Sequence, residues 1–308
     1  MPVNRLRTAA VSTCASILFA SLAATASAGI IFTDGFGDGD RDNNGLDSGA
    51  TATDALDVGV PWFYAGGGTS AATLIATDDS AGIGNGNALQ LFNSGSNNRP
   101  IAGHFTPVTL NDGDKIVMRF DARVVSTSAA ADRNFRFGLY SDAGTFVSGD
   151  QGSSDTTFMD DVGYNARVDV GADASNATSM DVTRDDSAAG TVIGGTATGI
   201  GISSTNSVNQ LVDAAKHHFE LTLTRSGTGL FITLQQDGNP LISGTDATPV
   251  PGNFTFNEAM LSTRSNAATD YRFDNIQVEY VPFVPEPTSI AAAGLVATGM
   301  LAKRRNRR

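Results

Sequence analysis

The chain has 308 residues, 41% of them hydrophobic and 17% charged, which is enough for a sizeable core and excludes a globally disordered chain. Its formal net charge of −12 argues against nucleic acid and anionic lipid as partners, because a negative surface repels them. The single cysteine, Cys14, excludes an internal disulfide.

Residues 1–28 have the three parts of a secretory signal peptide. A basic start is followed by a mostly small and apolar stretch at 9–22. Ala26 and Ala28 then supply the small-x-small pattern that signal peptidase accepts, so we expect cleavage after Ala28. The alternative is an uncleaved membrane anchor, for which the apolar stretch is short.

An acidic, glycine-rich stretch follows the leader. Its spacing Asp40-x-Asp42-x-Asn44-Gly45 matches the start of a calcium loop, in which alternate oxygens converge on one hard cation and a glycine permits the sharp turn. Thr51 stands where an EF-hand loop has its bidentate glutamate. The stretch therefore forms either a calcium site or a polar turn without metal. The candidate calcium ligands are Asp38, Asp40, Asp42, Asn44 and Asp47.

The segment around the single tryptophan is a second candidate for binding. Trp62 and Tyr64 lie just before a run of glycines. Exposed aromatic rings stack on the apolar faces of sugars, so both side chains are candidate ligand-stacking residues. The alternative is that they pack in the core, in a strand beside a glycine-rich turn.

Residues 29–283 are expected to form one all-β domain. Apolar and polar residues alternate with period two in short runs separated by turn residues, which is typical of half-buried strands. The clearest runs are 88–92, 115–124, 134–140, 164–170, 218–225, 230–236 and 271–280. The parity of the apolar residues switches at Asp274-Asn275, which predicts a β-bulge. Residues 141–160 and 171–210 are expected to form long loops with one weak strand pair.

This spacing of strands favours two antiparallel sheets packed face to face, which is an antiparallel jelly-roll sandwich. The long hairpins and the terminal strand at 273–278 resemble the concanavalin/laminin-G-like jelly rolls of exported bacterial proteins. The resemblance is one of pattern, so it implies the fold of 29–283 and no particular ligand.

Residues 284–308 form a separate unit of the sequence. The triplet Pro285-Glu286-Pro287 precedes an apolar run at 289–302, and a basic cluster ends the chain. The prolines hold the approach extended, and the apolar run predicts a short transmembrane helix with its basic end in the cytoplasm. The basic residues are Lys303, Arg304, Arg305, Arg307 and Arg308.

This order of parts resembles the PEP-CTERM sorting signals of bacterial envelope proteins. The resemblance implies that an exosortase-like enzyme in the membrane reads Pro285, Glu286 and Pro287 and releases the tail. The protein would be held transiently in the inner membrane and delivered to the cell surface or the extracellular matrix. The alternative is a C-terminal anchor that is never cut.

No catalytic constellation stands out in the sequence. It has no G-x-S-x-G elbow, no strand carrying paired glutamates, and no cysteine after export. We therefore expect a non-catalytic exported sandwich, with extracellular polysaccharide as a candidate partner. Two alternatives stay open: a structural adhesion component with no small ligand, and a polysaccharide-active enzyme.

Overall fold

The computed structural model divides the chain into two units, of which the larger comprises Ala28–Val281. The smaller comprises Met1–Ser27 and Pro282–Arg308, and most of it lies outside the described residues. No helix among the described residues is long and apolar enough to cross a membrane. The described residues are 27–36, 62–64, 71–75, 83, 87–92, 99–127, 131–142, 149–150, 161–170, 180–186, 198–204, 211, 214–249, 254–263 and 268–284.

The described parts of the larger unit contain strands and no helix, which confirms the all-β prediction. In chain order the strands are β1 (Gly29–Asp34), β2 (Trp62–Tyr64), β3 (Ala71–Ile75), β4 (Ala88–Phe92), β5 (Arg99–Thr109), β6 (Lys115–Thr127), β7 (Ala131–Ser141), β8 (Val162–Val170), β9 (Met180–Asp185), β10 (Thr198–Ser204), β11 (His217–Ser226), β12 (Gly229–Gln236), β13 (Asn239–Asp246), β14 (Thr255–Thr263) and β15 (Ala268–Val281).

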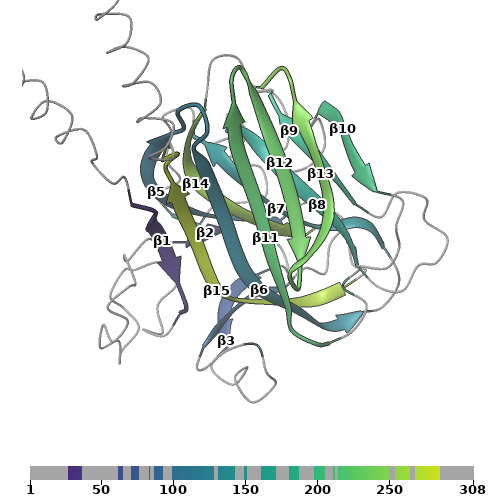
Figure 1. Ribbon diagram of the computed structural model, residues 1–308. Coiled ribbons are helices and arrows are strands. Elements are labelled where there is room, and N and C mark those ends of the chain that lie inside the picture. The colour runs from purple at the N-terminus through teal and green to yellow at the C-terminus, as the bar shows by residue number, and fades with distance from the viewer. Residues whose placement is uncertain are drawn as a thin grey trace, which may run out of the picture. The chain divides into compact units, whose positions relative to one another are not determined.

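The strands form two antiparallel sheets that pack face to face, with β11, β12 and β13 in front of β7, β8 and β9 in Figure 1. The eight-stranded sheet has the order β13-β12-β11-β6-β15-β4-β3, and β1 also pairs with β15. The seven-stranded sheet has the order β10-β9-β8-β7-β14-β5-β2. Consecutive described strands lie in different sheets at β1/β2, β2/β3, β4/β5, β5/β6, β6/β7, β10/β11, β13/β14 and β14/β15. This arrangement confirms the predicted antiparallel jelly-roll sandwich.

The core lies between the two sheets and is rich in phenylalanine. Alternate residues of β6 and β7 point inward, and their aromatic rings meet between the sheets. The ring centroid of Phe120 lies 4.8 Å from that of Phe137 and 5.5 Å from that of Phe219. Both sheets therefore contribute to one buried aromatic cluster, and this cluster determines which face of each strand is internal.

The predicted bulge in β15 is present. The register between β15 and β6 shifts between Asp274 and Gln277, and Asn275 adopts a positive φ of 52°. Phe273 before the bulge and Ile276 after it are both 0% exposed. Because the bulge adds one residue to the strand, odd-numbered residues face the core before it and even-numbered residues face the core after it.

Candidate functional site

One row of residues crosses β5, β14, β7, β8 and β9 on the outer face of the seven-stranded sheet. Strand pairing places His104 of β5 opposite Glu258 of β14, and Glu258 opposite Tyr140 of β7. Tyr140 in turn pairs with Gly163 of β8, which pairs with Asp185 of β9. His104, Glu258, Tyr140 and Gly163 each have a strand neighbour in the core, and Val182 of β9 also belongs to it, so the alternation of the strands points these residues and Asp185 away from the core. We call these residues the polar row.

The polar row is buried even though it faces away from the core. Tyr140 and Glu258 are 0% exposed, and Asp185 is 1% exposed. Asn165, which follows Gly163 on the same face of β8, is also 0% exposed. A buried polar group that lacks a hydrogen bond costs about 1–3 kcal/mol, because it has lost its contact with water. The hydrogen-bond partners that these groups have, and those they lack, therefore indicate what kind of molecule could bind at this face.

Two glycines determine the position of the Tyr140 ring. A Cβ atom added to Gly138 would lie 2.9 Å from Cε2 of Tyr140, and one added to Gly163 would lie 2.7 Å from Cδ1. Each added atom would also collide with the backbone of the paired strand, at Tyr164 and Leu139 respectively. The ring can lie over the sheet at this point only because neither position carries a side chain.

The Tyr140 hydroxyl stays protonated near neutral pH. Burial raises the pKa of Tyr140 well above its usual value of 10.0, and the negative charges of Asp185, Asp161 and Glu258 raise it further. A side-chain hydrogen-bonding contact with the amide of Asn165 lowers the pKa without overcoming these effects. The hydroxyl is therefore available both as a hydrogen-bond donor and as an acceptor.

Several polar atoms around Tyr140 make no hydrogen bond of ordinary geometry among the described residues. Asn165 Oδ1 accepts a hydrogen bond from Thr183 Oγ1 at 3.1 Å, which determines the orientation of the amide. Its Nδ2 atom and the Oη atom of Tyr140 make no hydrogen bond of ordinary geometry in the described part of the chain. The same is true there of Oγ of Ser262, on the same face of β14. A bound molecule or an ordered water that both donates and accepts would satisfy such groups.

His104 and Glu258 form one end of the polar row. His104 Nε2 lies 3.5 Å from Oε1 of Glu258. Burial lowers the pKa of His104, and the charge of Asp142 opposes this only in part, so the imidazole is uncharged near neutral pH. Asn257 holds Asp142 by donating from Nδ2 at 2.8 Å and accepting from the Asp142 backbone N–H at 2.9 Å. This end of the row therefore offers a neutral imidazole beside a carboxyl group.

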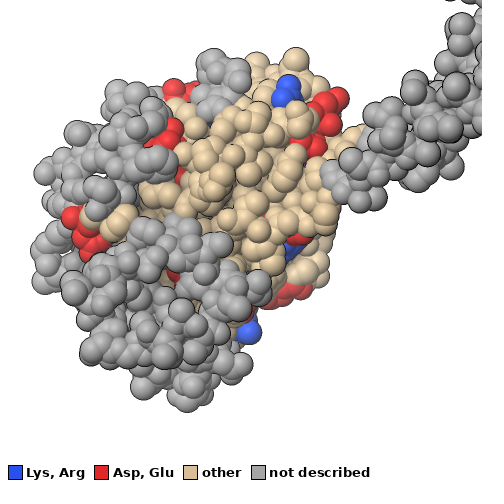
Figure 2. Space-filling model, turned by 90° about the vertical axis from the view of Figure 1, so that its left-hand side faces the viewer, with Lys and Arg blue, Asp and Glu red and all other residues tan. Residues whose placement is uncertain are grey.

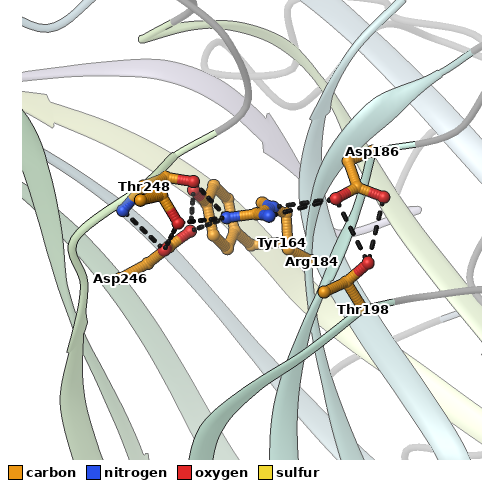
Figure 3. Close-up of polar contacts among 6 residues, drawn as sticks. All are labelled: Tyr164, Arg184, Asp186, Thr198, Asp246 and Thr248. Carbon is orange, nitrogen blue, oxygen red and sulfur yellow. Dashed lines mark hydrogen bonds and ion pairs between the residues drawn. The ribbon is translucent and has the colours of Figure 1, made fainter.

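A second polar cluster joins the edges of the two sheets (Figure 3). Arg184 of β9 donates from Nη1 to Oδ2 of Asp246 on β13 at 2.8 Å, and Tyr164 Oη donates to the same oxygen at 2.8 Å. Arg184 Nη2 lies 3.1 Å from Oδ2 of Asp186, to which Thr198 of β10 also donates. Burial raises the pKa of Asp246, but hydrogen bonds led by that from Arg184 outweigh it and hold the pKa below its usual value. These groups satisfy one another, so we interpret the cluster as structural and call it the edge clasp.

No family model matches the chain, and no curated protein matches it. Solved structures do match. A structure of peanut lectin with a 9mer peptide is 10% identical with a TM-score of 0.43, covering 73% of this chain and 93% of the lectin. A carbohydrate esterase from the Shiga toxin-encoding bacteriophage phi24B is 13% identical with a TM-score of 0.42, covering 83% and 100% of the two chains. A Bacillus subtilis protein of unknown function with a galectin-like fold is 11% identical with a TM-score of 0.39, covering 72% and 90%. These are likenesses of fold alone.

Most residues singled out by the sequence lie outside the described part of the chain. This holds for the cleavage-site residue Ala26, the sorting triplet at 285–287 and the basic tail at 303–308. It also holds for the candidate calcium ligands, Asp38, Asp40, Asp42, Asn44 and Asp47. Within the described ranges, no group of three or more His, Cys, Asp or Glu side chains is arranged to hold a metal ion.

The aromatic residues Trp62 and Tyr64 lie in the core. Trp62 is 0% exposed and Tyr64 is 5% exposed. The indole N–H of Trp62 donates to Oδ2 of Asp34 at 2.8 Å, and its ring meets that of Phe32 edge-on at 5.4 Å. This burial corrects the stacking interpretation in favour of core packing, because neither ring offers a face to a ligand.

On the face drawn in Figure 2, the acidic side chains of the described residues are spread out and do not gather in one patch. On the face drawn in Figure 2, Asp and Glu occupy several separate places around a broad uncharged region, and Lys and Arg occupy little of it. The field expected from the formal charge of −12 is therefore diffuse on this face. This negative field should repel polyanions, and it does not by itself indicate a binding site.

Proposed function

We propose that the protein is exported to the cell surface or extracellular matrix and that its sandwich binds a neutral saccharide at the polar row, without cleaving it. The observation that carries the binding part is a pair of buried atoms, Tyr140 Oη and Asn165 Nδ2, which interact with one another but make no hydrogen bond of ordinary geometry among the described residues. A sugar hydroxyl both donates and accepts, so saccharide hydroxyls would satisfy both atoms.

The surroundings of Tyr140 restrict the class of saccharide. Asp185, Asp161 and Glu258 are close enough to raise the pKa of the Tyr140 hydroxyl, and their negative charge disfavours uronate or sulfated sugars. A metal ion alone does not fit, because the N–H of the Asn165 amide needs an acceptor. The burial of the site favours a single sugar or the end of a chain over the middle of a long polysaccharide.

Ordered water is the simplest alternative occupant, because water also donates and accepts. The substitution Asn165→Asp keeps the acceptor used by Thr183 and removes the amide donor. Asn239→Asp adds the same charge at the exposed first residue of β13 and is the matched control. We expect binding of a neutral glycan by the purified protein to weaken at least about tenfold with the first substitution and to be unchanged with the second. If the unsubstituted protein bound no neutral glycan, a structural adhesion component would be the better description.

The export part of the proposal is supported by the sequence patterns at the two ends of the chain. We propose that signal peptidase cuts after Ala28 and that an exosortase-like enzyme acts at the triplet 285–287, releasing the tail. Mass spectrometry of the protein isolated from the envelope tests both steps. The expected N-terminus is Gly29, and the basic residues from Lys303 onward should be absent. A mature protein that kept both ends would contradict the proposal.

Calcium binding is a separate proposal, supported by the spacing Asp40-x-Asp42-x-Asn44-Gly45. A ligand that binds only the folded state raises Tm, so thermal unfolding in chelator and in millimolar calcium tests it. We expect calcium to raise Tm in the natural protein and to raise it less after Asp42→Asn. Equal values of Tm in both solutions would leave the polar turn as the correct interpretation.

A further inference from the structure

The outer face of β11, β12 and β13, the strands at the front in Figure 1, carries one exposed aromatic ring, that of Phe231. Leu230 and Ile232, its neighbours in β12, belong to the core, so the alternation of the strand points Phe231 out of the sandwich. Phe231 is 40% exposed, and no other phenylalanine, tyrosine or tryptophan described in the larger unit is exposed to this extent. The ring is therefore an accessible apolar surface on a sheet face that faces water.

The side chains that surround Phe231 on this face all carry one hydroxyl group. Strand pairing places Phe231 between a threonine of β11 and a threonine of β13, and a second row of three hydroxyl residues lies two positions along the strands. None of these five neighbours is buried; they are Thr222, Thr224, Thr233, Ser243 and Thr245. Adjacent strands lie about 4.8 Å apart and alternate residues about 7 Å apart, so the hydroxyl groups border the ring closely. We call Phe231 and these five residues the hydroxyl platform.

Charged side chains lie at the border of the hydroxyl platform and not within it. Arg119 of β6 is held between two carboxylates, with Nε 2.7 Å from Oε2 of Glu220 and Nη1 2.6 Å from Oε2 of Glu279. Lys115 of β6 lies opposite Thr224 and is a single positive charge on a protein whose net charge is −12. The platform itself therefore offers an apolar ring and hydrogen-bonding groups, and no charge that would select an ionic ligand.

The β12–β13 turn holds the strands of the hydroxyl platform in register. Asp237 and Gly238 have positive φ angles of 53° and 74°, as in the two-residue turns that match the twist of a hairpin. The Asp237 carboxylate accepts from the backbone N–H of His218 at 2.9 Å, and the Asp237 backbone N–H donates to the carbonyl oxygen of His218 at 2.8 Å. These contacts tie the turn to β11. The platform is therefore pre-organised, which lowers the entropic cost of binding.

We propose that the hydroxyl platform is a second binding surface, which takes a neutral polysaccharide with one sugar ring stacked on Phe231. A sugar ring has an apolar face and a rim of hydroxyl groups, and the platform has an apolar ring with hydroxyl groups around it. Because this surface is open, it receives an internal stretch of a chain, whereas the buried polar row favours a chain end. The two sites lie on different sheets, so neither depends on the other.

The chemistry of the hydroxyl platform favours a polysaccharide over a second protein. Stable protein interfaces bury about 800 Å² on each partner, and their central part is enriched in several aromatic and apolar side chains. The platform has one such ring, and hydroxyl residues occupy the positions around it. A partner that brings hydroxyl groups of its own matches these positions.

Affinity electrophoresis of the purified protein in hydroxyethylcellulose, laminarin and dextran, which are three neutral polysaccharides, tests the inference. We expect the natural protein to bind at least one of them, and Phe231→Ala to raise the Kd for it at least about tenfold. Phe231→Trp keeps a stacking ring and should bind at least as tightly. Ile30→Ala is the matched control, because it removes a side chain that is 47% exposed on β1, and it should leave the Kd unchanged. Binding of none of the three, or an equal Kd for the natural protein and Phe231→Ala, would overturn the inference.

Asn165→Asp distinguishes the hydroxyl platform from the polar row. It should leave polysaccharide binding unchanged, because Asn165 lies on the other sheet. A Kd that rose with Asn165→Asp and not with Phe231→Ala would place the chain at the polar row and contradict the platform. Sedimentation velocity tests a second copy of this chain as the occupant. A dimer that Phe231→Ala converted to a monomer would show that the platform is an interface between copies, and the inference would then be wrong.

Discussion

Nη1 of Arg184 lies 2.8 Å from Oδ2 of Asp246, so an ion pair joins the seven-stranded sheet to the eight-stranded sheet. The two side chains are only 13% and 4% exposed. Tyr164 reinforces the pair, because its hydroxyl donates to the same carboxylate oxygen at 2.8 Å. β13 is the outermost strand of its sheet and β9 is next to the outermost strand of the other. The edge clasp therefore links strand edges that belong to different sheets.

Replacing Arg184 with methionine should lower the free energy of unfolding by about 1–3 kcal/mol, because Asp246 would keep a mostly buried charge without its main partner. Asp186→Asn changes the more exposed end of the edge clasp and should cost less than about 1 kcal/mol. Chemical denaturation followed by circular dichroism measures both. Equal losses would show that the Asp246 end is not the stabilising part.

The edge clasp should also make stability depend on pH in the acid range. The pKa of Asp246 lies below its usual value of 3.8, so its contribution is fully present above the unfolded-state pKa and is lost as pH falls through the folded-state pKa. Asp246→Asn removes the titrating group and should flatten the slope of unfolding free energy below about pH 4. A slope unchanged by Asp246→Asn would contradict this assignment.

His104 should produce a second pH dependence nearer neutrality. Burial lowers its pKa below the usual 6.5, so the unfolded chain binds the proton more readily than the folded chain does. Stability is therefore greatest above about pH 6.5 and falls as pH drops below it, until the folded-state group is also protonated. His104→Gln should remove this fall in a denaturation series. A natural protein equally stable at about pH 5 and pH 7 would argue against a buried neutral imidazole.

Gly163→Ala should destabilise the protein, because the added methyl group would collide with Tyr140 and with the backbone of Leu139. Overpacking of this kind costs about 1–3 kcal/mol and sometimes more. Gly199→Ala is the matched control, because a Cβ atom there meets nothing within 4 Å. Thermal unfolding should show a clear loss for the first variant and little change for the second. If Gly163→Ala were tolerated, the Tyr140 ring would not be held as described.

Tyr140→Phe should separate binding from stability. The hydroxyl it removes makes no hydrogen bond of ordinary geometry among the described residues, so the free energy of unfolding should stay the same or rise by up to about 1 kcal/mol. Glycan binding should weaken. Tyr164→Phe is the comparison, because it removes a hydroxyl that donates to Asp246 at 2.8 Å and should cost about 1 kcal/mol. Similar losses in the two variants would indicate that a fixed water or another structural partner holds the Tyr140 hydroxyl.

The single tryptophan reports on the core and not on the polar row. Trp62 is 0% exposed, so its fluorescence should be shifted to the blue and resist quenching by acrylamide. Addition of a glycan that binds should leave both properties unchanged. A glycan-dependent change in Trp62 emission would reopen the stacking interpretation.

The strands that could be predicted are those with one face in the core and one in water. The runs 218–225 and 230–236 lie in β11 and β12, whose residues alternate between buried and less buried positions. β14 has a different pattern, because every residue after Thr255 is buried. When both faces of a strand are covered, the period-two signal disappears, and β14 was not predicted for this reason.

The polar row could not be predicted, because its members meet only through the order of the strands. The runs 134–140 and 164–170 contain Tyr140 and Asn165, but no local pattern indicates that β5 and β14 extend the same face. Gly138 in one of these runs was the available signal, since a glycine inside a strand marks a close approach of another backbone or ring. The bulge in β15 was predictable because a parity switch is visible within a few residues.

β15 is the last of the described strands in sequence order, and it pairs with β6, β4 and β1. A nascent chain that has not yet released residue 268 lacks the strand that connects these three. Pairing between segments so far apart in sequence is slow to form. The consequence is that the eight-stranded sheet cannot be completed until nearly the whole described chain has been synthesised, whereas hairpins such as β11–β12 can form earlier.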